Sequence, residues 1–268
     1  MQARSQLANL EAQWASELSD WAIPDEFLAK SNDSPFQLHP ETFKPDPKRR
    51  DTPSMQMAAE ALLGLPESER SLLDVGCAAG GTSLILLPPA ISLIAWDQSE
   101  IMLGALRENA KELEIDPEAI TTVNSSWPPS TSVSASVVTC ANVLYNVATP
   151  FSFISALIDA ATYHVVIELT ARHPHFSVNP IWEHFHSYRR PIQPSYHEII
   201  KMVELMGYQP KVNTWERNQL EADDSAVIGS IAQRACLAPA QFDDLANYLN
   251  QYPLAPTTVV AISFSTSR

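Results

Sequence analysis

Short apolar runs alternate with amphipathic stretches through the middle of the chain. Apolar residues that recur every three or four positions predict helices, whereas short β-branched runs predict strands. A first helix is expected over residues 54–63, and five strands are expected near residues 71–75, 91–96, 120–124, 136–141 and 164–169. Because strands that alternate with helices form βαβ units, this pattern predicts an α/β fold with a parallel sheet.

The alternation changes after the fifth strand. The pattern predicts a helix over residues 194–206, a strand over 210–216, and then two helices in succession over 224–236 and 239–249. The last element is the β-branched run from 257 to 264, which is typical of a strand.

The first 53 residues differ from the rest of the chain. Their apolar residues are spaced as on one face of a helix, namely Leu7, Leu10, Trp14, Leu18 and Trp21. An irregular, proline-rich stretch follows from 23 to 53, and its basic cluster at 48–50 is expected to be a solvated linker. We therefore divide the chain into an N-terminal helix and arm, residues 1–53, and a main domain, residues 54–268. The helix and arm are expected to lie across the mouth of the sheet as a cap, where they cover apolar surface, close a ligand pocket, or do both.

Composition narrows the class of protein. With 268 residues and 45% hydrophobic side chains, the chain can bury the core of one large domain. Its net charge of −14 argues against a nucleic-acid partner, because phosphate contacts need Lys and Arg. No apolar run is long enough for a membrane span. The 3 scattered cysteines predict neither a disulfide framework nor a metal site, so we expect a cytoplasmic protein.

The segment 72–81, with the sequence LLDVGCAAGG, is the most informative part of the chain. An apolar strand ends in Asp74, and a turn follows that holds Gly76, Gly80 and Gly81, three of the 7 glycines. Clustered glycines indicate a backbone that turns tightly or approaches a ligand. Residues 82–87 are expected to open a helix whose free N–H groups point back at the turn, as in a nucleotide site.

The flanks of this turn argue against a dinucleotide. Ala78 stands where the dinucleotide fingerprint has its second glycine, and the carboxylate of Asp74 would repel a pyrophosphate. The next apolar run ends in Asp97, 21 residues after Gly76. An acid at that place accepts hydrogen bonds from the two hydroxyls of a ribose.

At these residues the chain resembles the class I S-adenosylmethionine-dependent methyltransferases. The resemblance rests on the glycine turn, on the sequence AWDQS at 95–99, and on strand ends near 122–128 and 137–147. It covers roughly residues 52–170. It implies a doubly wound, mostly parallel seven-stranded sheet with an antiparallel last strand, helices on both faces and an N-terminal helical cap.

The resemblance also implies S-adenosyl-L-methionine as the cofactor. Ser126 stands where the family usually has an acid that binds the adenine amino group, so stacking on Trp127 or Met102 is the expected substitute. Alternatively, Trp127 is only a plug at the edge of the sheet. The cofactor-binding residues expected on this basis are Asp74, Gly76, Ala78, Gly80, Asp97, Gln98, Met102, Ser126, Trp127 and Asn142.

The segment after the fifth strand contains the candidates for acceptor chemistry. Five of the 7 histidines fall between 173 and 197, and ligands of open α/β sheets bind beyond the carboxyl ends of the strands. His173 and His186 are the candidates for a general base, followed by Tyr145. The H-x-H pairs lack a third ligand at a diagnostic spacing, so no metal is expected. Glu168, at the strand tip, is expected to pair with Arg172 or a histidine, or to bind substrate.

The favoured function is methyl transfer to a small molecule, with oxygen slightly ahead of nitrogen or carbon as the acceptor atom. Arg189 and Arg190 are candidates for holding an acidic acceptor. Two alternatives stay open, a non-catalytic protein that binds the cofactor and an NAD(P)-dependent oxidoreductase, although Asp74 and Ala78 count against the latter. The acceptor itself is not predicted, and a homodimer is left open.

Overall fold

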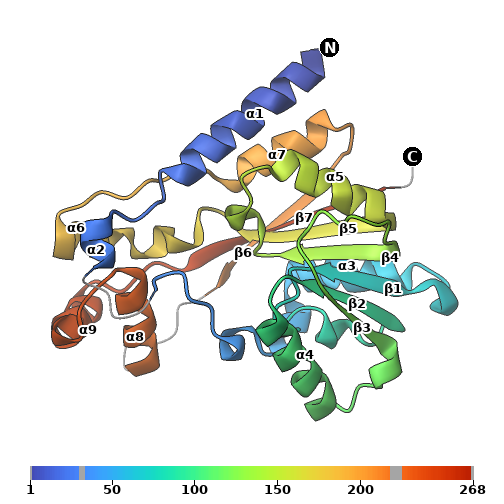
Figure 1. The fold of residues 1–268 in the computed structure, drawn as a ribbon, viewed down its shortest axis with the longest axis horizontal. Coiled ribbons are helices and arrows are strands. Elements are labelled where there is room, and N and C mark those ends of the chain that lie inside the picture. Colours follow the sequence, from blue (N-terminus) through green and yellow to red (C-terminus); the bar gives the residue numbers. More distant parts are fainter. Residues whose placement is uncertain (1, 30–33, 218–224, 267–268) are drawn as a thin grey trace.

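The computed structural model describes residues 2–29, 34–217 and 225–266, which form a sheet covered by helices (Figure 1). The strand order is β3-β2-β1-β4-β5-β7-β6. Strands β1 to β5 pair in parallel, and β7 is antiparallel to both of its neighbours, as the sequence predicted. The strands are β1 Ser71–Val75, β2 Ser92–Asp97, β3 Ile120–Asn124, β4 Ala135–Ala141, β5 Ala161–Thr170, β6 Lys211–Arg217 and β7 Thr257–Ser265.

Helices cover both faces of the sheet (Figure 1). One face packs against α5 and α7, with α1 lying across them, and the other packs against α3 and α4. No helix in the described ranges is long and apolar enough to cross a membrane. The helices are α1 Gln2–Ser19, α2 Asp25–Leu28, α3 Pro53–Leu63, α4 Glu100–Glu112, α5 Pro150–Ala160, α6 Asn179–His186, α7 Tyr196–Leu205, α8 Ser225–Arg234 and α9 Phe242–Gln251.

A second apolar core lies beside the sheet. Helices α2, α6, α8 and α9 lie together at one end of the molecule (Figure 1). They pack around Trp182, which is 1% exposed, and around Phe27 and Leu245. We call these four helices the small lobe. Since α8 and α9 are inserted between β6 and β7, the lobe joins segments from the beginning, middle and end of the chain.

The connection after the glycine turn differs from the expectation. In place of a helix over residues 82–87, the structure has a single 3₁₀ turn, Leu84–Leu86. Pro88 and Pro89 follow directly, and proline has no N–H to donate and restricts the residue before it. The prediction of a helix here is therefore wrong, because the two prolines leave room for only one turn.

Candidate active site

The glycine turn is packed tightly against the loop after β4. Gly76 and Gly80 have φ values of +75° and +84°, which side chains disfavour, and Ala78 adopts +45°. A Cβ atom on Gly76 would lie 2.3 Å from Cγ2 of Val143. The turn therefore requires glycine at Gly76 both for its conformation and for the approach of its neighbour.

Asp97 lies beside this turn at the carboxyl end of β2. Its Oδ2 accepts a hydrogen bond from the backbone N–H of Ala78 at 2.9 Å, and its Oδ1 accepts one from Ser99 at 2.8 Å. The side chain is only half-buried, and each carboxylate oxygen has a second lone-pair site. The two backbone donors thus hold a partly exposed carboxylate that can accept two further hydroxyl donors, which fits a ribose.

Asp74 supports the turn from inside the protein. Its carboxylate is fully buried and accepts hydrogen bonds from the hydroxyls of Thr82, at 3.1 Å, and Thr139, at 2.9 Å. Burial raises the pKa of Asp74, and these hydroxyl donors partly offset that rise. Its expected contact with the cofactor stays a prediction, since the hydroxyl groups that bond its side chain belong to the protein interior.

The residues expected near an adenine surround the ends of β2 and β3. Met102 is buried, whereas Gln98 and Ser126 are exposed. The Trp127 indole N–H donates to the carbonyl of Phe153 at 3.2 Å, and its ring meets Trp96 edge-on, with centroids 5.4 Å apart. Trp127 therefore already has the contacts of a plug against the core, and stacking on a base would use its remaining face.

Glu168 is the centre of a polar cluster at the end of β5. Its carboxylate is 2% exposed and lies 2.8 Å from Nη2 of Arg49. It also accepts hydrogen bonds from Nδ2 of Asn142, at 3.0 Å, and from the hydroxyl of Ser54. The expected pairing with Arg172 or a histidine is wrong, because Arg172 instead donates to the carbonyl of Ile192.

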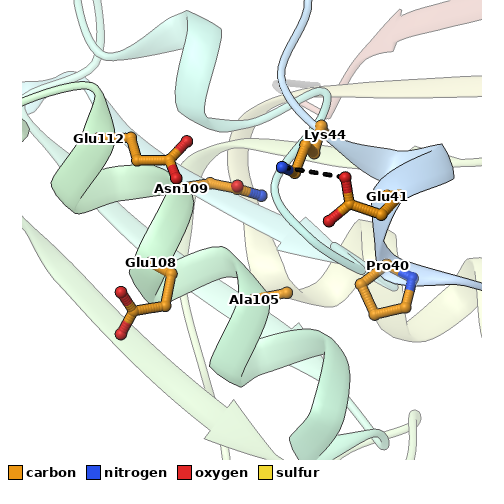
Figure 2. A pocket seen from close by; sticks show the side chains of 7 residues that line it. All are labelled: Pro40, Glu41, Lys44, Ala105, Glu108, Asn109 and Glu112. Carbon is orange, nitrogen blue, oxygen red and sulfur yellow. Dashed lines mark ion pairs between the residues drawn. The ribbon is translucent and has the colours of Figure 1, made fainter.

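The arm lies across the carboxyl edge of the sheet. Arg49 pairs with the buried Glu168, so the prediction that the basic cluster is only a solvated linker is wrong at this residue. The backbone of Phe43 approaches the glycine turn, because a Cβ on Gly81 would lie 2.6 Å from the Phe43 carbonyl oxygen. A pocket of about 270 Å³ lies where the arm meets α4, and the Lys44–Glu41 ion pair, 3.0 Å long, belongs to its lining. Figure 2 shows this ion pair among the lining side chains. The lining residues of the pocket are Pro40, Glu41, Lys44, Ala105, Glu108, Asn109 and Glu112.

His173 and Tyr145 meet under the N-terminal helix. The His173 ring stacks on Trp21, with centroids 4.1 Å apart, and its Nδ1 accepts a hydrogen bond from the backbone of His175 at 3.2 Å. Burial lowers the pKa of His173 to about 3. Tyr145 donates its hydroxyl to the Thr170 carbonyl at 3.0 Å, and burial raises its pKa.

His186 and the two arginines lie in or next to the small lobe. Nε2 of His186 is 2.7 Å from the carbonyl of Ala235, a residue of the small-lobe core. The His186 ring packs on Phe27 and Trp182 of the same core, apart from His173. Arg189 is exposed and pairs with Glu183 at 3.0 Å. Arg190 is buried and donates to the carbonyls of two residues that follow α1, Trp21 and Ala22. Across the described ranges, no three His, Cys, Asp or Glu side chains gather as metal ligands.

No sequence pattern points directly to the Arg49–Glu168 pair, since 119 residues separate its members. The single available clue was an acid at the tip of a central strand, which needs a buried partner but does not identify one. The structure brings together Gly76, Ala78, Gly80 and Asp97, as expected, and keeps His186 apart from them in the small lobe.

Comparisons with known proteins agree with this architecture. No family model matches the chain, and no curated protein does. A Bacillus halodurans C-125 protein proposed to be a methyltransferase matches with a TM-score of 0.57 and 14% identity, covering 80% of this chain and 100% of its own. YcgJ from Bacillus subtilis matches with a TM-score of 0.54 and 14% identity, covering 78% and 97%.

A third solved structure carries a ligand. Magnesium protoporphyrin IX methyltransferase (ChlM) from Synechocystis PCC 6803, with bound S-adenosylhomocysteine, matches with a TM-score of 0.50 and 13% identity, covering 78% of this chain and 82% of its own. At these identities the matches establish the fold alone. Together with the strand order and the antiparallel β7, they show that the chain has the Rossmann-like fold of the class I S-adenosylmethionine-dependent methyltransferases.

Proposed function

We propose that the protein is an S-adenosylmethionine-dependent methyltransferase that acts on a small molecule. The observation that carries this proposal is the Asp97 carboxylate, fixed by the Ala78 and Ser99 backbones beside the glycine turn. The structural neighbours support the same cofactor, because ChlM was solved with S-adenosylhomocysteine. We further propose that the protein is cytoplasmic, which the three buried cysteines support, because thiols without a disulfide suit a reducing compartment.

Each part of the site has a proposed role. Gly76 and Gly80 line the amino-acid end of the cofactor, Asp97 accepts from the ribose, and Met102 with Trp127 borders the adenine. The bound cofactor supplies an electrophilic methyl group on a sulfonium centre. The protein aligns the acceptor with that methyl group and excludes water, and we propose that residues 1–53 close this edge over the main domain.

The proposed acceptor has an attacking atom that needs no base from the protein. His173 has a pKa of about 3, so it is a weak base, and Tyr145 holds its proton more tightly than an ordinary phenol. An acceptor that arrives without a proton on the attacking atom, such as a carboxylate, needs no base from the protein. The weak basicity of His173 therefore supports oxygen, in a carboxylate, as the acceptor atom. A catalytic role for His173, His186 or Tyr145 stays a prediction.

Isothermal titration calorimetry tests the cofactor site. The wild-type protein should bind S-adenosylhomocysteine, and Asp97→Ala should weaken binding at least tenfold, because it removes two charge-assisted hydrogen bonds worth about 1.5–3 kcal/mol each. Asp116→Ala is the matched control, since it removes an equal charge from the cap of a surface turn. Binding of NAD(P) in place of S-adenosylhomocysteine, or equal affinity in a folded Asp97→Ala protein, would refute the proposal.

A further inference from the structure

Glu168 is a buried carboxylate that receives hydrogen bonds from three separate parts of the chain. It is 2% exposed near the end of β5, and a charge buried in this way requires partners. Arg49 donates from the arm at 2.8 Å, Ser54 donates from the first turn of α3, and Asn142, which follows β4, donates at 3.0 Å. One side chain thus joins the arm to the strand that lies next to β1.

The contact with Glu168 fixes the orientation of the Asn142 amide. An ionised carboxylate only accepts hydrogen bonds, so the amide atom that faces Oε1 of Glu168 must be the donor, Nδ2. The backbone N–H of Asn142 also donates to the Glu168 carbonyl, at 2.7 Å. Asn142 is therefore held at two points, and its Oδ1, on the other branch of the amide, can accept from another donor at this partly exposed position.

Asn142 also connects Glu168 to the glycine turn. Its φ is +59°, a conformation that asparagine adopts more readily than most residues do. The next residue, Val143, packs against the turn so closely that its Cγ2 would lie 2.3 Å from a Cβ on Gly76. A change in the contact between Glu168 and Asn142 therefore reaches the backbone that we propose to hold the amino-acid end of the cofactor.

On the other side of Glu168, the base of the arm has a regular local structure. Arg49 belongs to a short 3₁₀ turn, Pro47–Asp51, that leads into α3. Asp46 caps the start of this turn by accepting from the Lys48 N–H at 3.0 Å. The Arg49 carbonyl accepts from the N–H and the hydroxyl of Thr52, at 3.0 and 2.7 Å. The guanidinium is thus presented by a hydrogen-bonded turn, and its ion pair with Glu168 holds the arm to the edge of the sheet.

We propose that Glu168 is a positioning residue that couples closure of the arm to binding of the cofactor. The inference rests on the proposed function and deepens it. With Arg49 in place, Glu168 holds Asn142 and the glycine turn in the arrangement that binds the cofactor. When the arm leaves, the carboxylate loses its charged partner and its hold on Asn142 changes. Because coupling between two binding events is reciprocal, the bound cofactor in turn holds the arm closed. No chemical step is assigned to Glu168.

Calorimetry of the full-length protein with S-adenosylhomocysteine tests this coupling. Arg49→Gln should weaken binding about fivefold or more, the usual range for linked sites. Arg49→Lys should restore most of the affinity, because one nitrogen makes the contact with Glu168 and lysine keeps the charge. In an Asn142→Gly protein, the further change Arg49→Gln should have an effect of less than about twofold, because the link through the amide is already broken. Glycine suits the positive φ at this position.

Hydrogen exchange of residues 40–51 measures the other direction of the coupling. In the wild-type protein, S-adenosylhomocysteine should slow exchange in this part of the arm, and Arg49→Gln should abolish that slowing. Arg189→Gln is the matched control, because Arg189 carries the same charge in an exposed pair with Glu183. It should change neither the affinity nor the exchange of the arm.

The inference is overturned if Arg49→Gln binds S-adenosylhomocysteine as the wild-type protein does, or if it weakens binding equally with Asn142 and with glycine at that position. In the second case the arm only covers the cofactor. If Arg49→Gln alone does not fold, Glu168→Gln is compared with the double variant Glu168→Gln/Arg49→Gln, and equal affinities are expected. A wild-type protein that does not bind S-adenosylhomocysteine refutes the methyltransferase proposal as well, whereas the first two outcomes refute the coupling alone.

Discussion

The imidazole of His173 lies between Trp21 and Tyr145, two aromatic rings that exclude water from it. Its lowered pKa, about 3, means that the folded protein binds a proton here less readily than the unfolded chain, where a histidine titrates near 6.5. Acidification below pH 6.5 therefore favours the unfolded state. The stabilisation is complete above pH 6.5 and is lost as the pH falls toward 3.

This gives a prediction at the level of the single residue. Between pH 7 and pH 5, His173 should account for a loss of about 2 kcal/mol in the free energy of unfolding. His173→Gln removes the titrating group, so its unfolding free energy should depend less on pH over this interval, whatever its value at pH 7. Urea denaturation at the two pH values measures this dependence. The control is His184→Gln, at an exposed position of α6, which should keep the wild-type dependence of unfolding free energy on pH. If both variants reduce that dependence equally, His173 is not its source.

Individual residues also differ in how far the sequence predicted them. Asp97 was predictable because β1 and β2 are adjacent parallel strands, so the end of β2 lies beside the glycine turn that follows β1. The partner of Glu168 was not, because Arg49 comes from an arm without regular periodicity. Which residues an irregular segment brings to a site depends on tertiary packing, which hydrophobic patterns do not encode.

At the level of elements, the arm depends on the glycine turn for its position. Gly81→Ala would place a Cβ 2.6 Å from the Phe43 carbonyl oxygen, so the arm must move away from the turn. We expect a loss of about 1–3 kcal/mol in unfolding free energy and faster proteolysis within residues 40–51. Limited proteolysis followed by mass spectrometry would locate the cleavage.

The matched control is Gly104→Ala in α4, where a new Cβ meets no atom closer than 3.9 Å. Alanine favours the helix, so this variant should gain about 0.5–1 kcal/mol and keep the arm protected. If Gly81→Ala leaves the arm as resistant to protease as Gly104→Ala does, the arm is not held by the turn.

The elements themselves were largely predictable. All seven strands lie within a few residues of their expected positions, because apolar, β-branched runs between turns have few other conformations that bury them. The segment 82–87 was misjudged because its apolar residues suit a helix, while the two prolines that shorten it lie just beyond. At this position the two prolines, and not the spacing of the apolar residues, determine the local structure.

At the level of the whole molecule, α1 is joined to the sheet by large buried side chains. Trp14 is fully buried, stacks on Tyr145 and donates its N–H to the Val147 carbonyl at 2.8 Å. Removal of residues 1–19 should lower the free energy of unfolding by at least the 3–5 kcal/mol, roughly, that is typical of truncating a buried tryptophan. Urea denaturation measures this loss. Affinity for S-adenosylhomocysteine should change less than twofold, because Asp97 and its partners stay in place. A tenfold loss of that affinity would show that α1 supports the cofactor site directly.

The small lobe has a consequence for the chain while it is being made. Phe27 of α2 packs with Val227 and Ile231 of α8, which leave the ribosome about 200 residues later. At translation rates of about 5–20 residues per second, the apolar face of α2 waits about 10–40 s for its partners. The strands from β1 to β5 emerge during that interval and can pair in the order β3-β2-β1-β4-β5, while β5 gains its second neighbour, β7, only at the end of synthesis. The newborn protein therefore passes through a stage in which the sheet that holds Asp97 has formed while Ile23 and Phe27 still face water, and this is the stage at which a chaperone would bind the N-terminal segment.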